Sequence, residues 1–310
     1  MPAGVVLSKS LPIKVPEPLL GFVSFLYEYA DSVAILLLSA MGLIIIFGMM
    51  GVINMAHGEM MMIGAYITSF GYYAGIPLVL DPLLGGLGGA IAGILVERLI
   101  IQRFYGQLLS YLVVTWGLSL ILSQGALLLF GQLIKTVPTP FTSFTVGELS
   151  FAYYRVFLVV VALGMLFSLW LLFTQTRFGI YARATMENPE MARAMGVDTS
   201  LLYMITFGLG TGLAGISGGL LALTSTIGPF YGRGYTPQAF ITVVVGGAAD
   251  IFVGALASVL SLGAIRTVVT EHANILIGNV AMLVFAFIVV LFMPAGISDW
   301  IEKRWTTRPK

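Results

Sequence analysis

Three side chains that could do chemistry, Asn54, His57 and Glu59, stand close together in an otherwise apolar part of the chain. An ionisable side chain at the centre of a membrane span costs about 2.5–3.5 kcal/mol on insertion scales unless it faces a cavity or a partner. His57 and Glu59 superficially resemble a pair of metal ligands, but no third ligand follows at a suitable spacing, so we expect no metal site. Either His57 and Glu59 satisfy each other or cap the helix that starts near Gly58, or the segment lines the path of a polar solute, with Asn54 and His57 as hydrogen-bonding groups.

A second polar interruption, Thr236–Gly247, falls in the other half of the chain and ends in a Gly-Gly pair. Interrupted helices in both halves of a membrane protein point to a binding path near the middle of the bilayer. The alternative is two unrelated turns. The predicted substrate path has no catalytic residue and consists of Asn54, His57, Glu59, Thr236, Gln238 and Gly246.

The most polar segment, RFGIYARATMENPEMARAMG, runs from Arg177 to Gly196 between two long apolar spans. Such a segment cannot lie in hydrocarbon, and its cations Arg177, Arg183 and Arg193 place it in the cytoplasm by the positive-inside rule. We predict a short helix near 180–196. This helix is either an amphipathic helix on the membrane surface or a coupling helix that docks on a separate protein.

Local signals favour a short helix with defined ends inside this segment. Asn188 suits the N-cap, Pro189 the first helical position and Gly196 the C-terminal stop. Met191 and Met195 are four residues apart and share one face, where their flexible side chains suit a protein contact. The predicted coupling residues are Asn188, Pro189, Glu190, Met191, Ala192, Arg193, Met195 and Gly196.

Composition sets the class of protein in which these residues act. Of the 310 residues, 58% are hydrophobic and only 9% are charged, against about 25% charged residues in soluble domains. Apolar stretches of about 20 residues, the length that crosses the hydrocarbon core, recur along the chain. The 37 glycines suit close helix packing in lipid. The lack of cysteine excludes disulfides and a cysteine nucleophile, and the net charge of +1 gives no indication of nucleic-acid binding.

We therefore predict an all-α polytopic membrane protein with about 8–9 transmembrane helices, broken near 51–58 and 236–248. The predicted spans are 31–50, 58–75, 80–100, 108–131, 153–176, 201–226, 236–248, 251–270 and 275–296. The predicted parts are an N-terminal tail with a short interfacial helix (1–30), a transmembrane domain (31–298) with a cytoplasmic loop (177–198), and a cytoplasmic tail (299–310). The N-terminus and the 132–152 loop are expected on the opposite side of the membrane.

Four segments together resemble one family of membrane proteins. They are GVINMAHGEMMMIGAY (Gly51–Tyr66), GVDTSLLYMITFGLGTGLAGISGGL (Gly196–Leu220), TVVVGG (Thr242–Gly247) and MPAGI (Met293–Ile297). From about Ala34 to Gly296 the chain resembles the inner-membrane permeases of ABC importers for branched-chain amino acids and for urea or short amides.

The resemblance implies partners for this chain. They are a second homologous permease, two ATPase subunits that bind ATP and magnesium, a periplasmic solute-binding protein and the lipid bilayer, with no cofactor in this chain and no nucleic acid. It also implies a multi-pass protein of the bacterial cytoplasmic (inner) membrane, and the basic tail that contains Lys303, Arg304 and Lys310 places the C-terminus in the cytoplasm. The spacing of Glu190, Ala192 and Gly196 resembles the EAA-type loop that importer permeases insert into their ATPase. Because Ala192 is expected to keep the docking face flat, Ala192→Glu should uncouple a folded complex.

The resemblance leaves the solute open between two classes. Thr224–Gly247 looks more like the urea and short-amide permeases, whereas the C-terminal third is not typical of urea permeases. Glu59, Asp250 and Arg266 are few charges for a zwitterion, which needs a partner at both ends. The sequence favours urea or a short amide, with a branched-chain amino acid as the alternative. A passive channel would not need the 177–198 loop, and an intramembrane enzyme would need paired catalytic side chains in matching spans.

Overall fold

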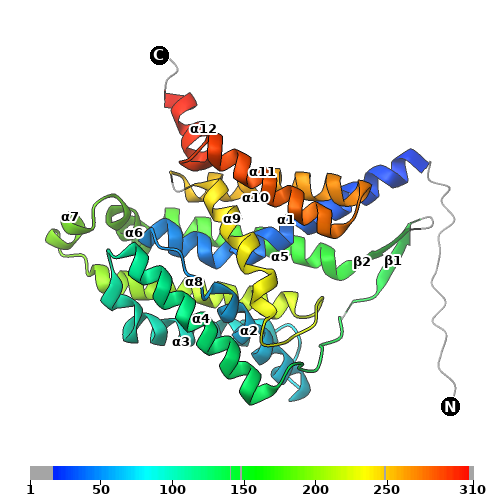
Figure 1. Ribbon diagram of the computed structural model, residues 1–310, viewed down its shortest axis with the longest axis horizontal. Coiled ribbons are helices and arrows are strands. Elements are labelled where there is room, and N and C mark those ends of the chain that lie inside the picture. The colour runs from blue at the N-terminus through cyan, green and yellow to red at the C-terminus, as the bar shows by residue number, and fades with distance from the viewer. Residues whose placement is uncertain (1–16, 140, 147–148, 248, 307–310) are drawn as a thin grey trace.

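The computed structural model describes residues 17–139, 141–146, 149–247 and 249–306 (Figure 1). Their elements are almost entirely helical. In chain order they are α1 (Glu17–Met50), α2 (His57–Tyr73), α3 (Asp81–Leu99), η1 (Ile101–Phe104), α4 (Leu108–Phe130), β1 (Ser143–Val146), β2 (Leu149–Ala152), α5 (Tyr153–Gln175), α6 (Arg177–Glu187), α7 (Pro189–Ala194), α8 (Thr199–Leu221), η2 (Tyr231–Gly234), α9 (Thr236–Gly246), α10 (Ile251–His272), α11 (Ile275–Phe292) and α12 (Gly296–Thr306).

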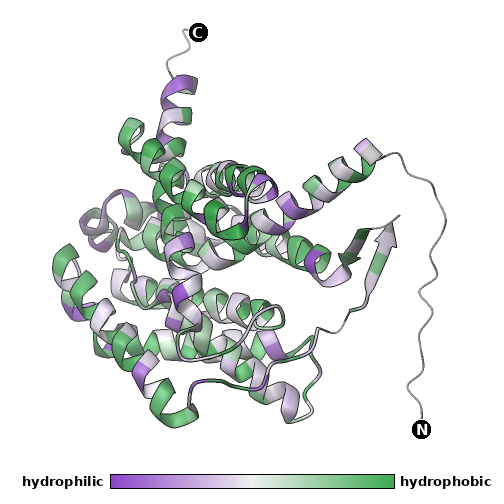
Figure 2. Cartoon of the chain, turned by 45° about the vertical axis from the view of Figure 1, so that its right-hand side comes forward, coloured by the Kyte–Doolittle hydropathy of each residue, from purple (hydrophilic) through white to green (hydrophobic). Residues whose placement is uncertain are grey.

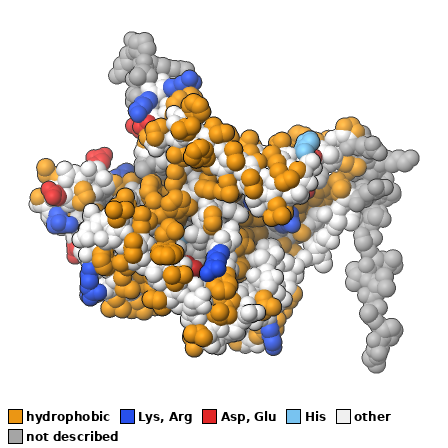
Figure 3. All heavy atoms as spheres, viewed as in Figure 1, with side chains coloured by type: hydrophobic (Ala, Val, Ile, Leu, Met, Phe, Trp, Pro, Cys, Tyr) orange, Lys and Arg blue, Asp and Glu red, His pale blue; other side chains and the backbone are white. Residues whose placement is uncertain are grey.

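The helices confirm an all-α polytopic membrane protein. Within the described ranges, seven helices are long and apolar enough to cross a membrane: α1, α3, α4, α5, α8, α10 and α11. Two further predicted spans are shorter helices, α2 with 17 residues and α9 with 11. Apolar residues run along the helices (Figure 2), and hydrophobic side chains are spread over the middle of the face seen in Figure 3, as lipid contact requires.

The first helix is longer than predicted. A separate interfacial helix within residues 1–30 was expected, but α1 is continuous from Glu17 to Met50. No helix breaker separates the two predicted pieces, and Pro18 occupies the first turn, where proline is tolerated. The separate interfacial helix is therefore not formed, and most of the predicted tail, residues 1–16, lies outside the described residues.

The core of the bundle is built on α1 and α8. In each of these helices 72% of the most apolar window is buried inside the chain, against 17% in α11 and 22% in α4. Glycines permit this packing: Gly64 of α2, Gly85 of α3 and Gly215 of α8 meet where a Cβ on any of them would strike the backbone of another. Small residues at such crossings are the usual means of close helix approach in membranes.

The two ends of the bundle differ in structure. Helices α6 and α7 project at one end, and the β1–β2 hairpin lies at the other (Figure 1). The hairpin falls inside the segment 132–152, which was predicted as a loop, and pairs Ser143 with Ala152 and Val146 with Leu149. Tyr27 anchors it to α1, because the Tyr27 hydroxyl donates to the Ala152 carbonyl at 3.0 Å. The hairpin therefore marks the end of the bundle farthest from α6 and α7.

Candidate functional site

The two polar interruptions meet in space. Gly58, at the start of α2, lies so close to η2 that a Cβ there would be 2.7 Å from the carbonyl oxygen of Gly232 and would overlap the Thr236 hydroxyl. Tyr231 holds η2 against α8, since its hydroxyl donates to the Gly218 carbonyl at 2.9 Å. Segments more than 170 positions apart (58 to 232) thus form one junction between the halves of the chain.

The three polar side chains of the first interruption are buried beside this junction. Asn54, His57 and Glu59 are 1%, 0% and 5% exposed. Asn54 Oδ1 accepts from the Ala56 amide at 3.0 Å and so holds the turn before α2. His57 Nε2 lies 2.8 Å from the carbonyl oxygen of Ser39 in α1. These contacts hold the turn before α2 and tie its first residue to α1, but no side chain caps α2, whose N-cap is Ala56, so the predicted cap is not formed.

Some polar atoms at the junction have no partner. Asn54 Nδ2, His57 Nδ1, Glu59 Oε2 and Gln238 Oε1 are buried without a hydrogen-bond partner among the described residues. Buried polar groups in folded proteins are nearly always satisfied. The other oxygen of Glu59 interacts with Ser119, and the Arg233 cation is close enough to act on it electrostatically. Arg233 was not among the predicted site residues, although it is the only cation of the segment that joins α8 to α9.

The structure separates the remaining predicted path residues. Thr236 begins α9 at the junction, where its hydroxyl donates to the Gly232 carbonyl at 2.9 Å. Gly246 ends the same 11-residue helix, about 15 Å away at 1.5 Å per residue. There it packs against Gly254 of α10. Asn54, His57, Glu59 and Thr236 therefore lie at or within a few residues of the junction, Gln238 follows two residues after Thr236 in α9, and Gly246 belongs to a helix contact.

His57→Leu is expected to destabilise the junction by about 1 kcal/mol, the usual worth of a lost hydrogen bond. Among the described residues, the His57 ring makes one hydrogen bond, which joins it to the Ser39 carbonyl. Thermal unfolding of the purified protein measures the loss. His57→Gln, which keeps an N–H donor, should retain most of the stability. Loss of uptake with unchanged unfolding would instead place His57 in the solute path.

The polar segment 177–196 forms two helices rather than the single helix predicted near 180–196. The break falls at Asn188, which ends α6 and serves as the N-cap of α7. Its Oδ1 accepts from the Met191 amide at 2.9 Å, and Pro189 cannot donate a hydrogen bond to continue α6. The same two residues that were predicted to start a helix therefore also end the preceding one.

Helix α7 ends as predicted. Gly196 has φ +89°, the Gly196 amide donates to the Arg193 carbonyl and the Val197 amide donates to the Ala192 carbonyl, the bonding pattern of a Schellman cap. The Arg193 guanidinium also donates to the Thr199 hydroxyl at 2.9 Å, which ties α7 to α8. This short helix is thus held rigidly at the end of the bundle.

One predicted coupling residue faces inward. Met191 and Met195 are 57% and 68% exposed, as a docking surface requires, but Ala192 is only 1% exposed. Ala192 packs against this chain, so a glutamate there would disrupt the loop itself. The burial of Ala192 therefore argues against the expectation that Ala192→Glu leaves a folded complex.

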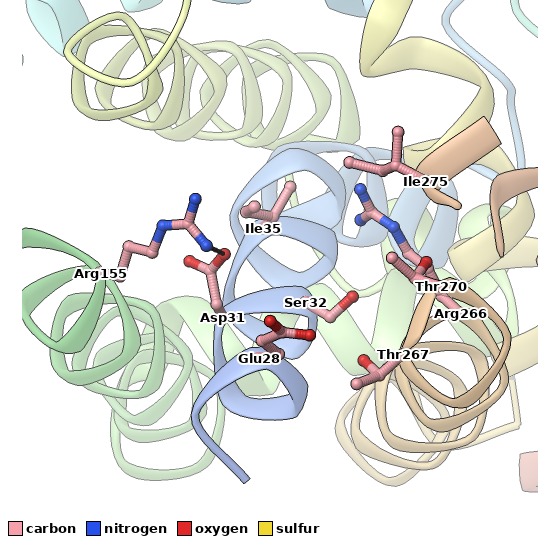
Figure 4. Close-up of a pocket in the computed structure, with 9 residues that line it drawn as sticks. All are labelled: Glu28, Asp31, Ser32, Ile35, Arg155, Arg266, Thr267, Thr270 and Ile275. Atoms are coloured by element: carbon pink, nitrogen blue, oxygen red, sulfur yellow. Dashed lines mark hydrogen bonds and ion pairs between the residues drawn. The ribbon is translucent and has the colours of Figure 1, made fainter. Parts of the chain in front are cut away.

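A charged cavity lies toward the hairpin end and was not predicted. Asp31 of α1 pairs with Arg155 of α5 at 3.0 Å, and Arg266 of α10 lines the same cavity (Figure 4). The sequence pattern identified Arg266 only as one of the few charges in the spans and did not identify Asp31. The sequence did contain a signal for this cavity, because Asp31 follows Glu28 by three residues in an otherwise apolar helix.

Comparison with known proteins gives a consistent family. The family described as "Branched-chain amino acid transport system / permease component" matches residues 25–293. The chain is 28% identical over 277 residues to the high-affinity branched-chain amino acid transport system permease protein BraD of Pseudomonas aeruginosa, covering 84% of this chain and 90% of BraD. It is 27% identical over 277 residues to LivH of Escherichia coli, a permease protein of the same kind of system, with the same coverage.

A more distant similarity extends to sugar transport. The galactofuranose transporter permease protein YtfT of Escherichia coli is 30% identical over 205 residues, 64% of this chain and 57% of that protein. No solved structure matches the chain significantly.

Proposed function

This chain belongs to the family of branched-chain amino acid transport system permease components, and from that premise we propose that it is the membrane-spanning subunit of an ABC importer for branched-chain amino acids. The observation that supports this solute is the similarity to BraD and LivH along 84% of this chain and 90% of theirs. This similarity favours a branched-chain amino acid, the alternative in the sequence analysis, over urea or a short amide. None of the matched proteins is named for urea or an amide.

We further propose how the subunit works in its complex. A second homologous permease, two ATPase subunits that bind ATP and magnesium, and a periplasmic binding protein complete the importer. Helices α6 and α7 face the cytoplasm, where the exposed Met191 and Met195 contact an ATPase. The junction around Asn54, His57, Glu59, Thr236 and Gln238 forms part of the solute path or supports it.

We also propose how the chain is oriented in the cytoplasmic membrane. If α6 and α7 are cytoplasmic, the β1–β2 hairpin faces the periplasm, where the binding protein delivers the solute. The C-terminal helix α12, with Lys303 and Arg304 in its last turn, is cytoplasmic. ATP hydrolysis belongs to the partner subunits, and this chain has a transport role without catalysis. The region 31–298 acts as one permease domain.

The complete importer reconstituted in proteoliposomes is expected to accumulate leucine, isoleucine and valine when ATP and the binding protein are supplied. Uptake of radiolabelled leucine should saturate and should be unchanged by a large excess of urea or acetamide, because an uncharged solute does not compete for a zwitterion site. Empty liposomes and a complex with inactivated ATPase are the controls. Uptake of labelled urea that leucine does not inhibit would refute the proposed solute.

A further inference from the structure

The cavity near the hairpin end collects charges of both signs around a small space. It has a volume of about 170 Å³, below the roughly 300–1,000 Å³ of pockets for drug-sized ligands, and so suits a small solute. Its charged lining residues are Glu28 and Asp31 of α1, Arg155 of α5 and Arg266 of α10. Two acids and two bases make the lining neutral overall.

The acidic residues of the cavity lie on one face of α1, between the two arginines. Glu28, Asp31, Ser32 and Ile35 are spaced at i, i+3, i+4 and i+7, which puts them on one face of α1. In Figure 4 this face lies between Arg155 on one side and Arg266 on the other. Asp31 is 8% exposed, so its negative charge is held inside the cavity wall and not at the surface of the bundle.

The two arginines are not equivalent. Arg155 is half exposed, with 49% of its side chain accessible, and is paired with Asp31. Arg266 has a buried Nη1 without a hydrogen-bond partner in the described part of the chain, and the Thr267 and Thr270 hydroxyls of the same helix are likewise buried and unpartnered. These three α10 residues line the cavity and supply donors for a carboxylate, which takes two parallel N–H bonds from arginine.

We propose that this cavity binds the zwitterionic head of an α-amino acid on its way through the permease. The carboxylate lies on Arg266 and the two threonine hydroxyls, the ammonium group lies between Asp31 and Glu28, and the aliphatic side chain contacts Ile35 and Ile275. This inference rests on the proposed function, since it names the site for the proposed solute. It also supplies the paired charges that the sequence seemed to lack.

The competing explanation is that the Asp31–Arg155 pair only holds α1 to α5. Charge reversal separates the two roles. In the double variant Asp31→Arg with Arg155→Asp the ion pair can form again, so a structural pair would keep normal solute binding. A ligand site would lose binding although the complex assembles, because the ammonium group then meets a cation.

The test is equilibrium binding of labelled leucine to the full complex in lipid nanodiscs, without the binding protein. Arg266→Gln and Asp31→Asn should each weaken leucine binding by about tenfold to a hundredfold, the range for a lost hydrogen bond to a charged group. Arg98→Gln and Asp299→Asn make the same chemical changes outside the cavity and should bind leucine normally. Size-exclusion profiles report assembly of every variant.

Competition for leucine binding tests the same site in the wild-type complex. 4-Methylpentanoate lacks the ammonium group and 3-methylbutylamine lacks the carboxylate, so each should compete at least about tenfold more weakly than leucine. Equal competition by either compound, normal binding in both cavity variants, or full binding in the charge-reversed variant would overturn the site. Leucine uptake by the same wild-type complex decides whether the site alone is wrong. If the complex takes up leucine, only the proposed site is wrong. If uptake is absent as well, both the proposed solute and the proposed site are wrong.

Discussion

Met191→Glu is expected to separate ATP hydrolysis from transport in the assembled importer. The Met191 side chain is 57% exposed on α7, a short helix capped at both ends and tied to α8 through Arg193 and Thr199. A glutamate at the centre of a protein contact buries an unpaired charge, and truncating such central contacts alone costs about 2 kcal/mol or more. Transport should fall roughly thirtyfold, and ATP hydrolysis should no longer respond to the loaded binding protein.

The experiment compares uptake and ATPase rate in the same proteoliposomes. Met191→Leu keeps an apolar side chain of similar volume and should retain both activities, because volume-conserving apolar exchanges are tolerated best. Ala192→Glu is not a suitable test, since Ala192 is buried and the variant would confuse misfolding with uncoupling. Normal coupled transport by a correctly assembled Met191→Glu complex would show that α7 does not contact the ATPase.

The ends of α7 could be predicted because they depend on local sequence. The Asn188 side chain, the ring of Pro189 and the positive φ of Gly196 act within one turn of the helix. The direction in which Ala192 points could not be predicted in this way. The direction of the Ala192 side chain depends on how α6 and α7 pack against the bundle. The break at Asn188 gives α7 a different direction from that of a single continuous helix.

The candidate site shows the same division between local and distant information. Clusters of polar residues in apolar sequence identified both interruptions, and the structure brings them together at Gly58 and Gly232. Sequence pattern alone did not pair Asp31 with Arg155, because the two residues are 124 positions apart and each looks like an ordinary charge at the end of a span. The shortage of paired charges was therefore an incorrect argument for an uncharged solute.

The solute preference illustrates a further limit of sequence patterns. The segment Thr224–Gly247 contains η2 and α9, whose Gly232 and Gly246 pack closely against α2 and α10. A likeness in such a segment reports on close helix contacts as much as on solute chemistry. Whole-chain similarity to amino-acid permeases is a broader observation, since it covers 84% of the chain.

Gly215→Val is expected to abolish the folded protein. Gly215 lies in α8 at the crossing with α2 and α3, and a Cβ there would overlap the carbonyl oxygen of Gly85 and lie 3.1 Å from the Gly86 Cα. Overpacking a core typically costs about 1–3 kcal/mol, occasionally more. The upper end applies here because the obstructing atoms are backbone, which cannot rotate away. The helices must move apart, and the contacts around α8 are lost with them.

The matched control is Gly117→Val in α4. Apart from the neighbouring backbone of α4 itself, no atom of the described residues lies within 4 Å of a Cβ at Gly117, and valine is a slightly better helix former than glycine, by a few tenths of a kcal/mol. The control should therefore keep or slightly raise the unfolding temperature, whereas Gly215→Val should give aggregated protein on size exclusion after mild extraction. Gly215→Ala, with one methyl group, should lie between the two. A Gly215→Val protein that elutes and transports normally would mean that α2, α3 and α8 are not in close contact, and the junction at Gly58 would then need another explanation.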